Sequence, residues 1–222
     1  GLYVASPRGV LGHRRLAIMD PAGGAQPIYN ENHSAAIVAN GEIYNFPALH
    51  RDLRTRHHFT TTSDSEAILH LFEEQDATLT QTLQGMFAFA IQSADRLFLA
   101  RDPIGIKPLY YGQRRQPAGD SLFYFASEMK PLADWAEDLH EFPPGHYFDS
   151  RQGFVQYYTV PTSDPDHSRS VTEHITQVRQ TLEAAVASHL MSDVPVGAFL
   201  SGGLDSSVIA AMARQHVREL HT

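Results

Sequence analysis

A glycine loop with small hydroxyl side chains occupies SGGLDSS, residues 201–207. It stands between the apolar run VPVGAFL and an alanine-rich stretch that favours a helix. Backbone N–H groups that converge at a helix start bind phosphate, and glycine lets the backbone approach it closely. The Lys of a Walker A loop is missing, and Asp205 has the wrong charge to bind phosphate directly. We therefore expect Asp205 to act through a divalent cation; the alternative is an ordinary strand-to-helix turn.

Two further positions combine polar side chains with an apolar run. Asn40-Gly41 follows AAIVA, and Asn-Gly is the pair that a type I′ hairpin turn favours. Asp64 stands directly before SEAIL, where a carboxylate suits a helix N-cap. Arg101 and Asp102 are adjacent at the end of an apolar run, which predicts a structural ion pair, and Lys107 is expected to belong to the scaffold.

The elements that must position these residues fall into two parts. Up to about residue 158 the sequence is typical of an antiparallel β protein with short helices. Its strands are expected at 35–40, 122–127 and 146–158, with a hairpin at 86–102 that turns at SAD. Two helices are expected at 46–54, where Pro47 suits a first turn, and at 63–75.

The second part differs in composition and in apolar pattern. Residues 159–170 are polar and rich in proline, which predicts a linker. Apolar residues then recur every three or four positions over 171–190, which predicts an amphipathic helix, and Ser170 and Glu173 form a capping box at its start. The run VPVGAFL (194–200) predicts a buried parallel strand. We therefore expect one domain at 1–158, a linker at 159–170 and the start of an α/β domain at 171–222.

Composition excludes several classes of protein. The chain has 222 residues, is 42% hydrophobic and has a net charge of −8, which argues against non-specific nucleic-acid binding. No apolar run approaches the roughly 20 residues that span a bilayer, and no secretory signal is seen, so a cytoplasmic location is expected. The absence of cysteine excludes disulfides and a thiol nucleophile within these residues. The 13 histidines are scattered, which favours ordinary imidazoles over a metal site.

A series of motifs gives these parts a common interpretation. In order they are HRRLAIMD, AQPI, NGEIYN, TTSDSEAI, GMFAFAI, RDPIGIKPLYY, FASEMKPL, FPPGHY and SGGLDSS. The series, from about Gly12 to Met212, resembles glutamine-dependent asparagine synthetases, in which a class II glutamine amidotransferase is fused to an ATP pyrophosphatase-type synthetase. The resemblance implies an α+β Ntn-hydrolase-type αββα sandwich, truncated at its N-terminus, followed by the start of a parallel-sheet α/β domain.

The resemblance also implies a glutamine pocket in the first part. Asn40 and Gly41 would form an oxyanion hole, in which each donor contributes about 2.7–4 kcal/mol to the transition state. Arg15 would bind the substrate α-carboxylate through its planar guanidinium, and Glu42 and Asp64 would hold the α-ammonium group. The complete set of glutamine-binding residues implied is Arg15, Leu16, Ala17, Ile18, Met19, Asn40, Gly41, Glu42 and Asp64.

In the second part the resemblance implies an ATP site with Mg²⁺ as cofactor. The ATP-binding residues implied are Leu200, Ser201, Gly202, Gly203, Leu204, Asp205 and Ser206. Asp205 would hold Mg²⁺ through the pyrophosphate. The expected partners are glutamine, aspartate and ATP, with neither nucleic acid nor membrane, and a homodimer is left open.

The sequence departs from the family in one respect. A class II glutaminase uses the thiol of an N-terminal cysteine, whereas this chain has no cysteine and begins at Gly1. We therefore expect an internal fragment of an ATP-dependent carbon–nitrogen ligase, inactive by itself. The alternatives are another ATP-dependent amidotransferase, such as a β-lactam synthetase, and a non-catalytic glutamine-binding module. NGEIYN, KPLYY and FASEMKPL favour asparagine synthetase.

Overall fold

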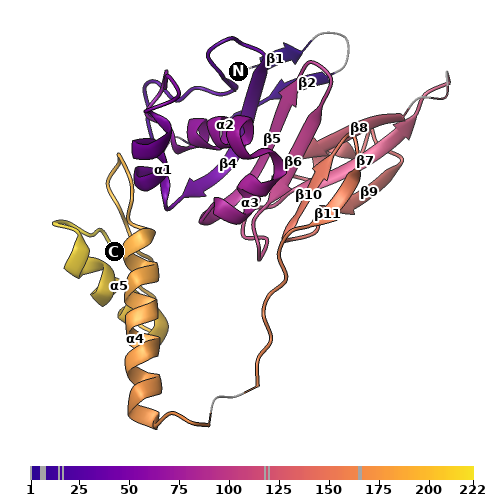
Figure 1. The fold of residues 1–222 in the computed structure, drawn as a ribbon. Coiled ribbons are helices and arrows are strands. Elements are labelled where there is room, and N and C mark those ends of the chain that lie inside the picture. Colours follow the sequence, from indigo (N-terminus) through magenta and orange to yellow (C-terminus); the bar gives the residue numbers. More distant parts are fainter. Residues whose placement is uncertain are drawn as a thin grey trace. The chain divides into compact units, whose positions relative to one another are not determined.

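The computed structural model describes residues 2–5, 9–14, 16, 18–117, 119, 121–164 and 167–222. The chain forms two compact units, which are best considered one at a time (Figure 1). The first consists of Gly1–Leu16 and Ala22–Val160, and the second of Ala17–Pro21 and Pro161–Thr222. The domain boundaries expected from the sequence stay a prediction.

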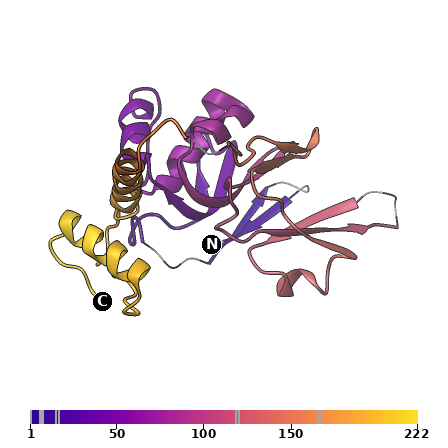
Figure 2. The ribbon, with the colours of Figure 1, turned by 90° about the horizontal axis from the view of Figure 1, so that it is seen from below.

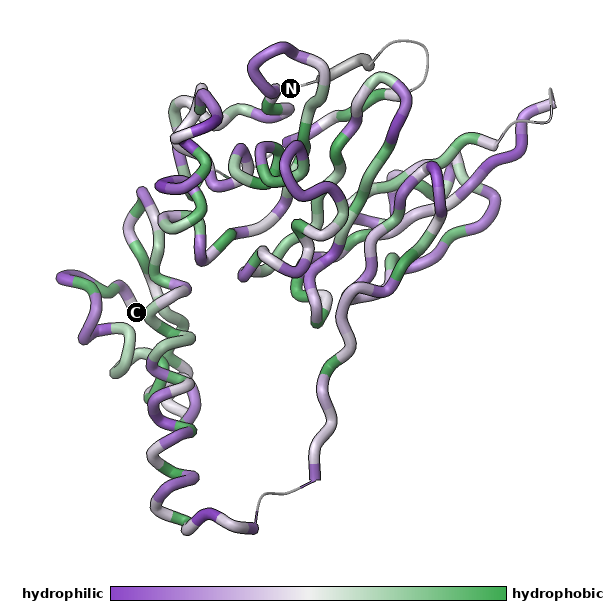
Figure 3. The backbone as a smooth tube through the Cα atoms, viewed as in Figure 1, coloured by the Kyte–Doolittle hydropathy of each residue, from purple (hydrophilic) through white to green (hydrophobic). Residues whose placement is uncertain are grey.

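A six-stranded antiparallel sheet forms the centre of the first unit, in the order β11-β10-β6-β5-β4-β3. Its middle strands bury side chains on both faces, and Figure 3 shows much of their length as hydrophobic. The predicted strand at 35–40 and the hairpin at 86–102 are confirmed, as is the hairpin within 146–158. The strands are β3 (Ile28–Tyr29), β4 (Ala35–Ile43), β5 (Gly85–Ser93), β6 (Leu97–Arg101), β10 (His146–Asp149) and β11 (Gly153–Gln156).

Helices cover one face of this sheet (Figure 2). The predicted helices are confirmed as α1 (Phe46–Leu53), with Pro47 in its first turn, and α2 (Asp64–Gln75). The helix α2 packs against β3 and β4 and is followed by the short turns η2 (Asp76–Thr78) and α3 (Leu79–Thr82). Nearly the whole first two turns of α2 are buried, so its position relative to the sheet is fixed by packing.

A second sheet lies on the other face. It contains β7 (Tyr110–Arg115), β8 (Ser121–Ala126) and β9 (Asp138–Glu141) in the order β8-β7-β9, with η3 (Lys130–Leu132) between the last two in sequence. Apolar side chains from the two sheets and from the residues beside them, among them Val38, Leu99 and Phe142 directly after β9, form one buried cluster. A small ribbon of β1 (Leu2–Ala5) and β2 (Gly9–Gly12) completes the described strands. The described residues thus form helix, sheet and sheet layers.

The second unit is built from two helices. The helix α4 (Val171–Ser188) begins with the predicted capping box of Ser170 and Glu173, which is confirmed. The helix α5 (Leu204–His216) follows the glycine loop. No helix among the described residues is both long enough and apolar enough to cross a membrane.

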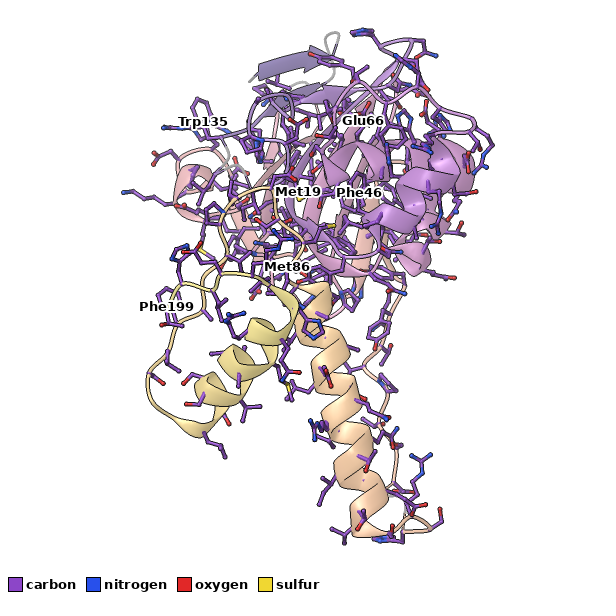
Figure 4. All side chains as sticks on the ribbon, turned by 90° about the vertical axis from the view of Figure 1, so that its left-hand side faces the viewer. Met19, Phe46, Glu66, Met86, Trp135 and Phe199 are labelled. Carbon is purple, nitrogen blue, oxygen red and sulfur yellow. The ribbon has the colours of Figure 1, made fainter. Side chains whose placement is uncertain are left out.

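The buried strand predicted at 194–200 is wrong. Only an isolated parallel bridge joins Gly197 to His221, and Phe199 is fully exposed at 102% of its reference area, projecting from the loop in Figure 4. A parallel strand needs neighbouring strands to satisfy its backbone groups, and among the described residues of this unit only the segment at His221 contributes to this. The apolar stripe of α4 is exposed for the same reason, at Val171, Ile175 and Val178.

Candidate functional site

Asn40 and Gly41 lie inside β4, so the hairpin turn considered as the alternative for this pair is not formed. They stand opposite Ala88 and Phe87 of β5. A Cβ on Gly41 would lie 2.2 Å from the Met86 carbonyl oxygen, and one on Gly85 would lie 2.1 Å from that of Glu42. Glycine is therefore required here by the close approach of two strands.

Past the short stretch that pairs with β3, the backbone groups on the outer edge of β4 form hydrogen bonds with side chains instead of with another strand. The Ala39 N–H donates to Gln26 Oε1 at 2.6 Å, and the Ala39 carbonyl accepts from Gln26 Nε2 at 3.0 Å. Two positions beyond Gly41, the Ile43 N–H donates to Asp64 Oδ2 at 2.7 Å. Because alternate residues of a strand direct their N–H groups to the same edge, the Gly41 N–H points to this edge, between Gln26 and Asp64.

The Asn40 side chain belongs to the other set of alternating positions. It lines a cavity of about 180 Å³ together with residues of β4, β5 and β8, among them Val38, Ala88 and Phe125. The remaining lining is mainly apolar, with His13 and Ser127 as further polar members. Consecutive residues of β4 thus offer a side-chain amide and a backbone N–H, the two donors that an oxyanion hole requires.

Two carboxylates stand at the same end of β4. Asp64 is only 3% exposed and anchors the first turn of α2 to the Ile43 amide. The N-cap role considered for Asp64 belongs instead to Ser63, whose hydroxyl accepts from the Ser65 N–H at 3.3 Å. Glu42 is half-buried on β4. Burial, together with the charges of Glu42 and Asp102, raises the pKa of Tyr44 to about 12, so this phenol stays protonated.

The other predicted glutamine-binding residues are placed differently. Arg15 and Ala17 lie outside the described residues. Leu16 is 92% exposed in the first unit. Ile18 and Met19 are grouped with the second unit, where the Asp193 N–H donates to the Ile18 carbonyl. Of the implied glutamine-binding residues that the structure describes, Asn40, Gly41, Glu42 and Asp64 thus lie at one end of β4, and the others do not.

Arg101 and Asp102 are buried but do not form the predicted ion pair with each other. Arg101 pairs with Glu141 at 2.7 Å and donates to the Lys107 carbonyl. Asp102 accepts from the backbone N–H groups of Ile106 and Lys107. Successive side chains of a strand point to opposite faces, so neighbours at a strand end do not meet. The expected scaffold role of Lys107 agrees with these contacts through its backbone.

The glycine loop in the second unit has the features of a phosphate cradle. Gly202 has a φ of 83°, and Gly203 is the N-cap of α5 without a side-chain hydrogen bond. The hydroxyls of Ser206 and Ser207 donate back to the Gly203 carbonyl, so neither occupies the first-turn N–H groups of α5. Asp205 lies in this exposed first turn. Free helix-start amides beside a carboxylate suit a phosphate with its divalent cation.

Comparison with known proteins covers both parts of the chain. Residues 1–189 match the family model of the glutamine amidotransferase domain, and residues 177–222 match that of asparagine synthase. The chain is 46% identical to "Asparagine synthetase [glutamine-hydrolyzing] 3" of Arabidopsis thaliana, over 94% of this chain and 36% of that protein. It is 42% identical to "Asparagine synthetase B [glutamine-hydrolyzing]" of Escherichia coli (strain K12), over 97% and 39%. The resemblance seen in the motifs is confirmed, and the chain spans well under half the length of these relatives.

Solved structures support the fold. Glutamine phosphoribosylpyrophosphate amidotransferase from B. subtilis superimposes with a TM-score of 0.51 at 22% identity, over 89% of this chain and 48% of that one. A structure of the allosteric regulatory enzyme of purine biosynthesis superimposes with a TM-score of 0.50 at 22% identity, over 90% of this chain and 47% of that one. The predicted Ntn-hydrolase-type sandwich is confirmed at the level of fold.

Proposed function

The chain belongs to the glutamine amidotransferase domain family, and from this premise we propose that it is the glutamine-hydrolysing part of an asparagine synthetase with the first elements of the synthetase attached. Glutamine gives ammonia, ATP activates aspartate as β-aspartyl-AMP with release of pyrophosphate, and ammonia displaces AMP to give asparagine. Two family models matched in this order support the proposal. The names of the similar proteins favour it over a β-lactam synthetase or a non-catalytic module.

The end of β4 is the observation that carries this proposal. When a nucleophile attacks the side-chain carbonyl of glutamine, negative charge develops on its oxygen. The Asn40 amide and the Gly41 N–H would donate to that oxygen, and each such donor is worth about 2.7–4 kcal/mol in the transition state. Glu42 and Asp64 would hold the α-ammonium group, since both carboxylates lie at this end of the strand.

The glycine loop supplies the second site of the proposal. First-turn N–H groups of α5 would donate to phosphate oxygens of ATP, with the hydroxyl of Ser201 beside them. Asp205 would hold Mg²⁺, which supplies positive charge to neutralise the pyrophosphate that leaves. The donor set fits this ion, because Mg²⁺ is usually held by one or two carboxylates together with substrate phosphates.

The test of the proposal compares two sources of nitrogen in the full-length protein that carries this chain. In Asn40→Ala, the loss of one oxyanion donor should lower kcat for glutamine-dependent asparagine formation by about 10²–10³-fold. Formation from added ammonium should stay unchanged, because it bypasses the glutaminase. Asn32→Ala, in an exposed loop, is the control. The assignment would be contradicted if Asn40→Ala lowered kcat equally with glutamine and with ammonium, or if it left both values unchanged.

A further inference from the structure

Two histidines and two glutamates converge on the helical side of the first unit, outside the residues assigned above. Glu31 comes from the loop between β3 and β4, His57 follows α1, and His70 and Glu73 lie one turn apart on α2. One ligand atom from each residue lies within 4.8 Å of the other three. Three segments that are separate in sequence therefore meet at one set of metal-ligating atoms.

The spacing of these atoms fits a tetrahedral ion. His57 Nδ1 lies 3.3 Å from Glu31 Oε1 and 3.7 Å from Glu73 Oε2. His70 Nδ1 lies 3.0 Å from Glu73 Oε2 and 3.8 Å from Glu31 Oε2. A zinc ion with bonds of about 2.0–2.1 Å places its ligands about 3.3–3.4 Å apart. The three distances from the Nδ1 atoms to Glu31 Oε1 or Glu73 Oε2, 3.0, 3.3 and 3.7 Å, bracket that value, and the 3.8 Å distance involves the other oxygen of Glu31. The two imidazole rings stack at 4.5 Å, so both Nδ1 atoms face the same two carboxylates.

A carboxylate lies behind each of the two histidines. The second nitrogen of each histidine faces another carboxylate. His57 Nε2 lies 3.1 Å from Glu74 Oε1, whereas His70 Nε2 lies 3.7 Å from Glu66 Oε1, beyond hydrogen-bond distance, and has no hydrogen-bond partner among the described residues. Glu66, labelled in Figure 4, is fully buried and also accepts four hydrogen bonds from Thr60 and Thr61. Carboxylates behind ligating histidines are the usual second shell of zinc sites, where they fix the ring orientation.

The two glutamate ligands are oriented as well. Asn30 Nδ2 donates to Glu73 Oε1 at 2.7 Å, which leaves Oε2 to face the histidines. The His58 backbone N–H donates to Glu31 Oε1 at 2.9 Å. With neutral imidazoles, the two ligand carboxylates carry two negative charges. A divalent cation would balance them. Without it, four glutamates surround the two histidines, and one of these glutamates, Glu74, is paired with Arg56 at 2.6 Å.

We propose that Glu31, His57, His70 and Glu73 form a closed, structural zinc site. All four positions of a tetrahedral ion are filled by protein, so no open position remains for substrate. The ion would join the loop before β4, the segment after α1 and the middle of α2. Because α2 begins at Asp64, which contacts the Ile43 amide, the site would stabilise the helix that supports the end of β4.

The competing account is a cluster held together by protons. Burial by itself would lower the pKa of His70, but its contacts with Glu66 and Glu73 outweigh this effect and raise that pKa to about 9. A protonated His70 would then satisfy the same carboxylates without metal. Since a zinc ligand must be a neutral imidazole, the two accounts differ in whether added zinc displaces protons.

The test uses the tag-free, full-length protein after treatment with EDTA. Zinc chloride is titrated by calorimetry in two buffers of different ionisation enthalpy, which reports affinity and proton release together. Cobalt chloride gives the absorption spectrum of the site, and thermal unfolding is followed with and without zinc. The variants are His57→Asn and Glu73→Gln, with His58→Asn as the matched control, because His58 is exposed and contributes only its backbone.

One zinc ion should bind with release of protons and raise the Tm, and cobalt should give a tetrahedral spectrum. His57→Asn and Glu73→Gln should each weaken zinc binding by at least about 100-fold, and His58→Asn should not change it. Glu74→Gln, behind His57, should weaken it by about 10–100-fold. Equal zinc affinity in the unaltered protein and both ligand variants, or no change of Tm with zinc, would overturn the proposal in favour of the protonated cluster. The result does not depend on the proposed function, because no activity is measured.

Discussion

The end of β4 and the glycine loop before α5 both present backbone N–H groups, but they are held in different ways. Around β4 the contacts are distant in sequence: the Ala39 N–H donates to the Gln26 side chain, and the Ile43 N–H donates to the Asp64 carboxylate. In the glycine loop the side-chain hydrogen bonds described for residues 201–207 join residues of the loop to one another. The first site depends on the packing of a whole unit, whereas the second depends on local geometry.

This difference explains which changes should harm which site. A substitution at the glycine loop should alter the loop and leave the fold of its unit intact. A substitution at β4 should disturb either the chemistry or the packing of the sheet, according to whether the side chain faces substrate or backbone. The following predictions test that separation, from the largest effect to the smallest.

Asp205→Ala should abolish asparagine formation from both glutamine and ammonium in the full-length protein, because ATP activation precedes either route. Glutamine hydrolysis, followed as ammonia release, should continue. Asp164→Ala, exposed in the segment before α4, is a comparison at which synthesis should persist. Synthesis or pyrophosphate release that survives in Asp205→Ala would contradict the role proposed for this carboxylate.

Asp64→Asn should raise KM for glutamine by about 10–100-fold while ammonium-dependent synthesis is unchanged. A hydrogen bond to a charged group contributes about 1.5–3 kcal/mol, and each 1.4 kcal/mol is tenfold. The asparagine keeps an oxygen that can accept from the Ile43 N–H, so the fold should remain. Asp52→Asn, exposed on α1, is the control. A normal KM for glutamine would remove Asp64 from the pocket.

Gly41→Ala should lower the free energy of unfolding of the first unit by about 1–3 kcal/mol, the usual range for overpacking. Its new Cβ would lie 2.2 Å from the Met86 carbonyl oxygen. Gly202→Ala is the counterpart. Its Cβ would meet no atom within 4 Å, so the expected loss of stability comes from the backbone alone: holding an alanine at a φ of 83° costs about 1–2 kcal/mol. Urea unfolding of both variants should show the larger loss for Gly41→Ala; the reverse order would contradict the contrast.

Sequence reasoning succeeded where local pattern decides structure. The apolar runs of β4 to β6, the apolar face of α2 and the capping box of α4 were all predicted from the sequence, because each signal lies within one element. The glycine loop was readable for the same reason. The pattern around SGGLDSS fixes a turn and a helix start, whatever else surrounds it.

Sequence reasoning failed where a distant partner decides the outcome. The strand conformation of Asn40-Gly41 was not predicted, because the pair alone favours a turn and its pairing with β5 decides otherwise. VPVGAFL has the composition of a buried strand, but the described residues give it no sheet. Arg101 finds Glu141 rather than its neighbour. The histidine–glutamate cluster had no signal at all, because α1, α2 and a loop bring its members together.

The most direct test of the central claim is a crystal structure of the full-length protein with glutamine bound under conditions that prevent turnover. We predict that the side-chain carbonyl oxygen of glutamine lies about 2.7–3.1 Å from both Asn40 Nδ2 and the Gly41 N, the distances of a working oxyanion hole. The α-ammonium group should contact Glu42 and Asp64. A glutamine whose carbonyl oxygen contacts neither Asn40 nor Gly41 would contradict the assignment of this strand end as the glutaminase site.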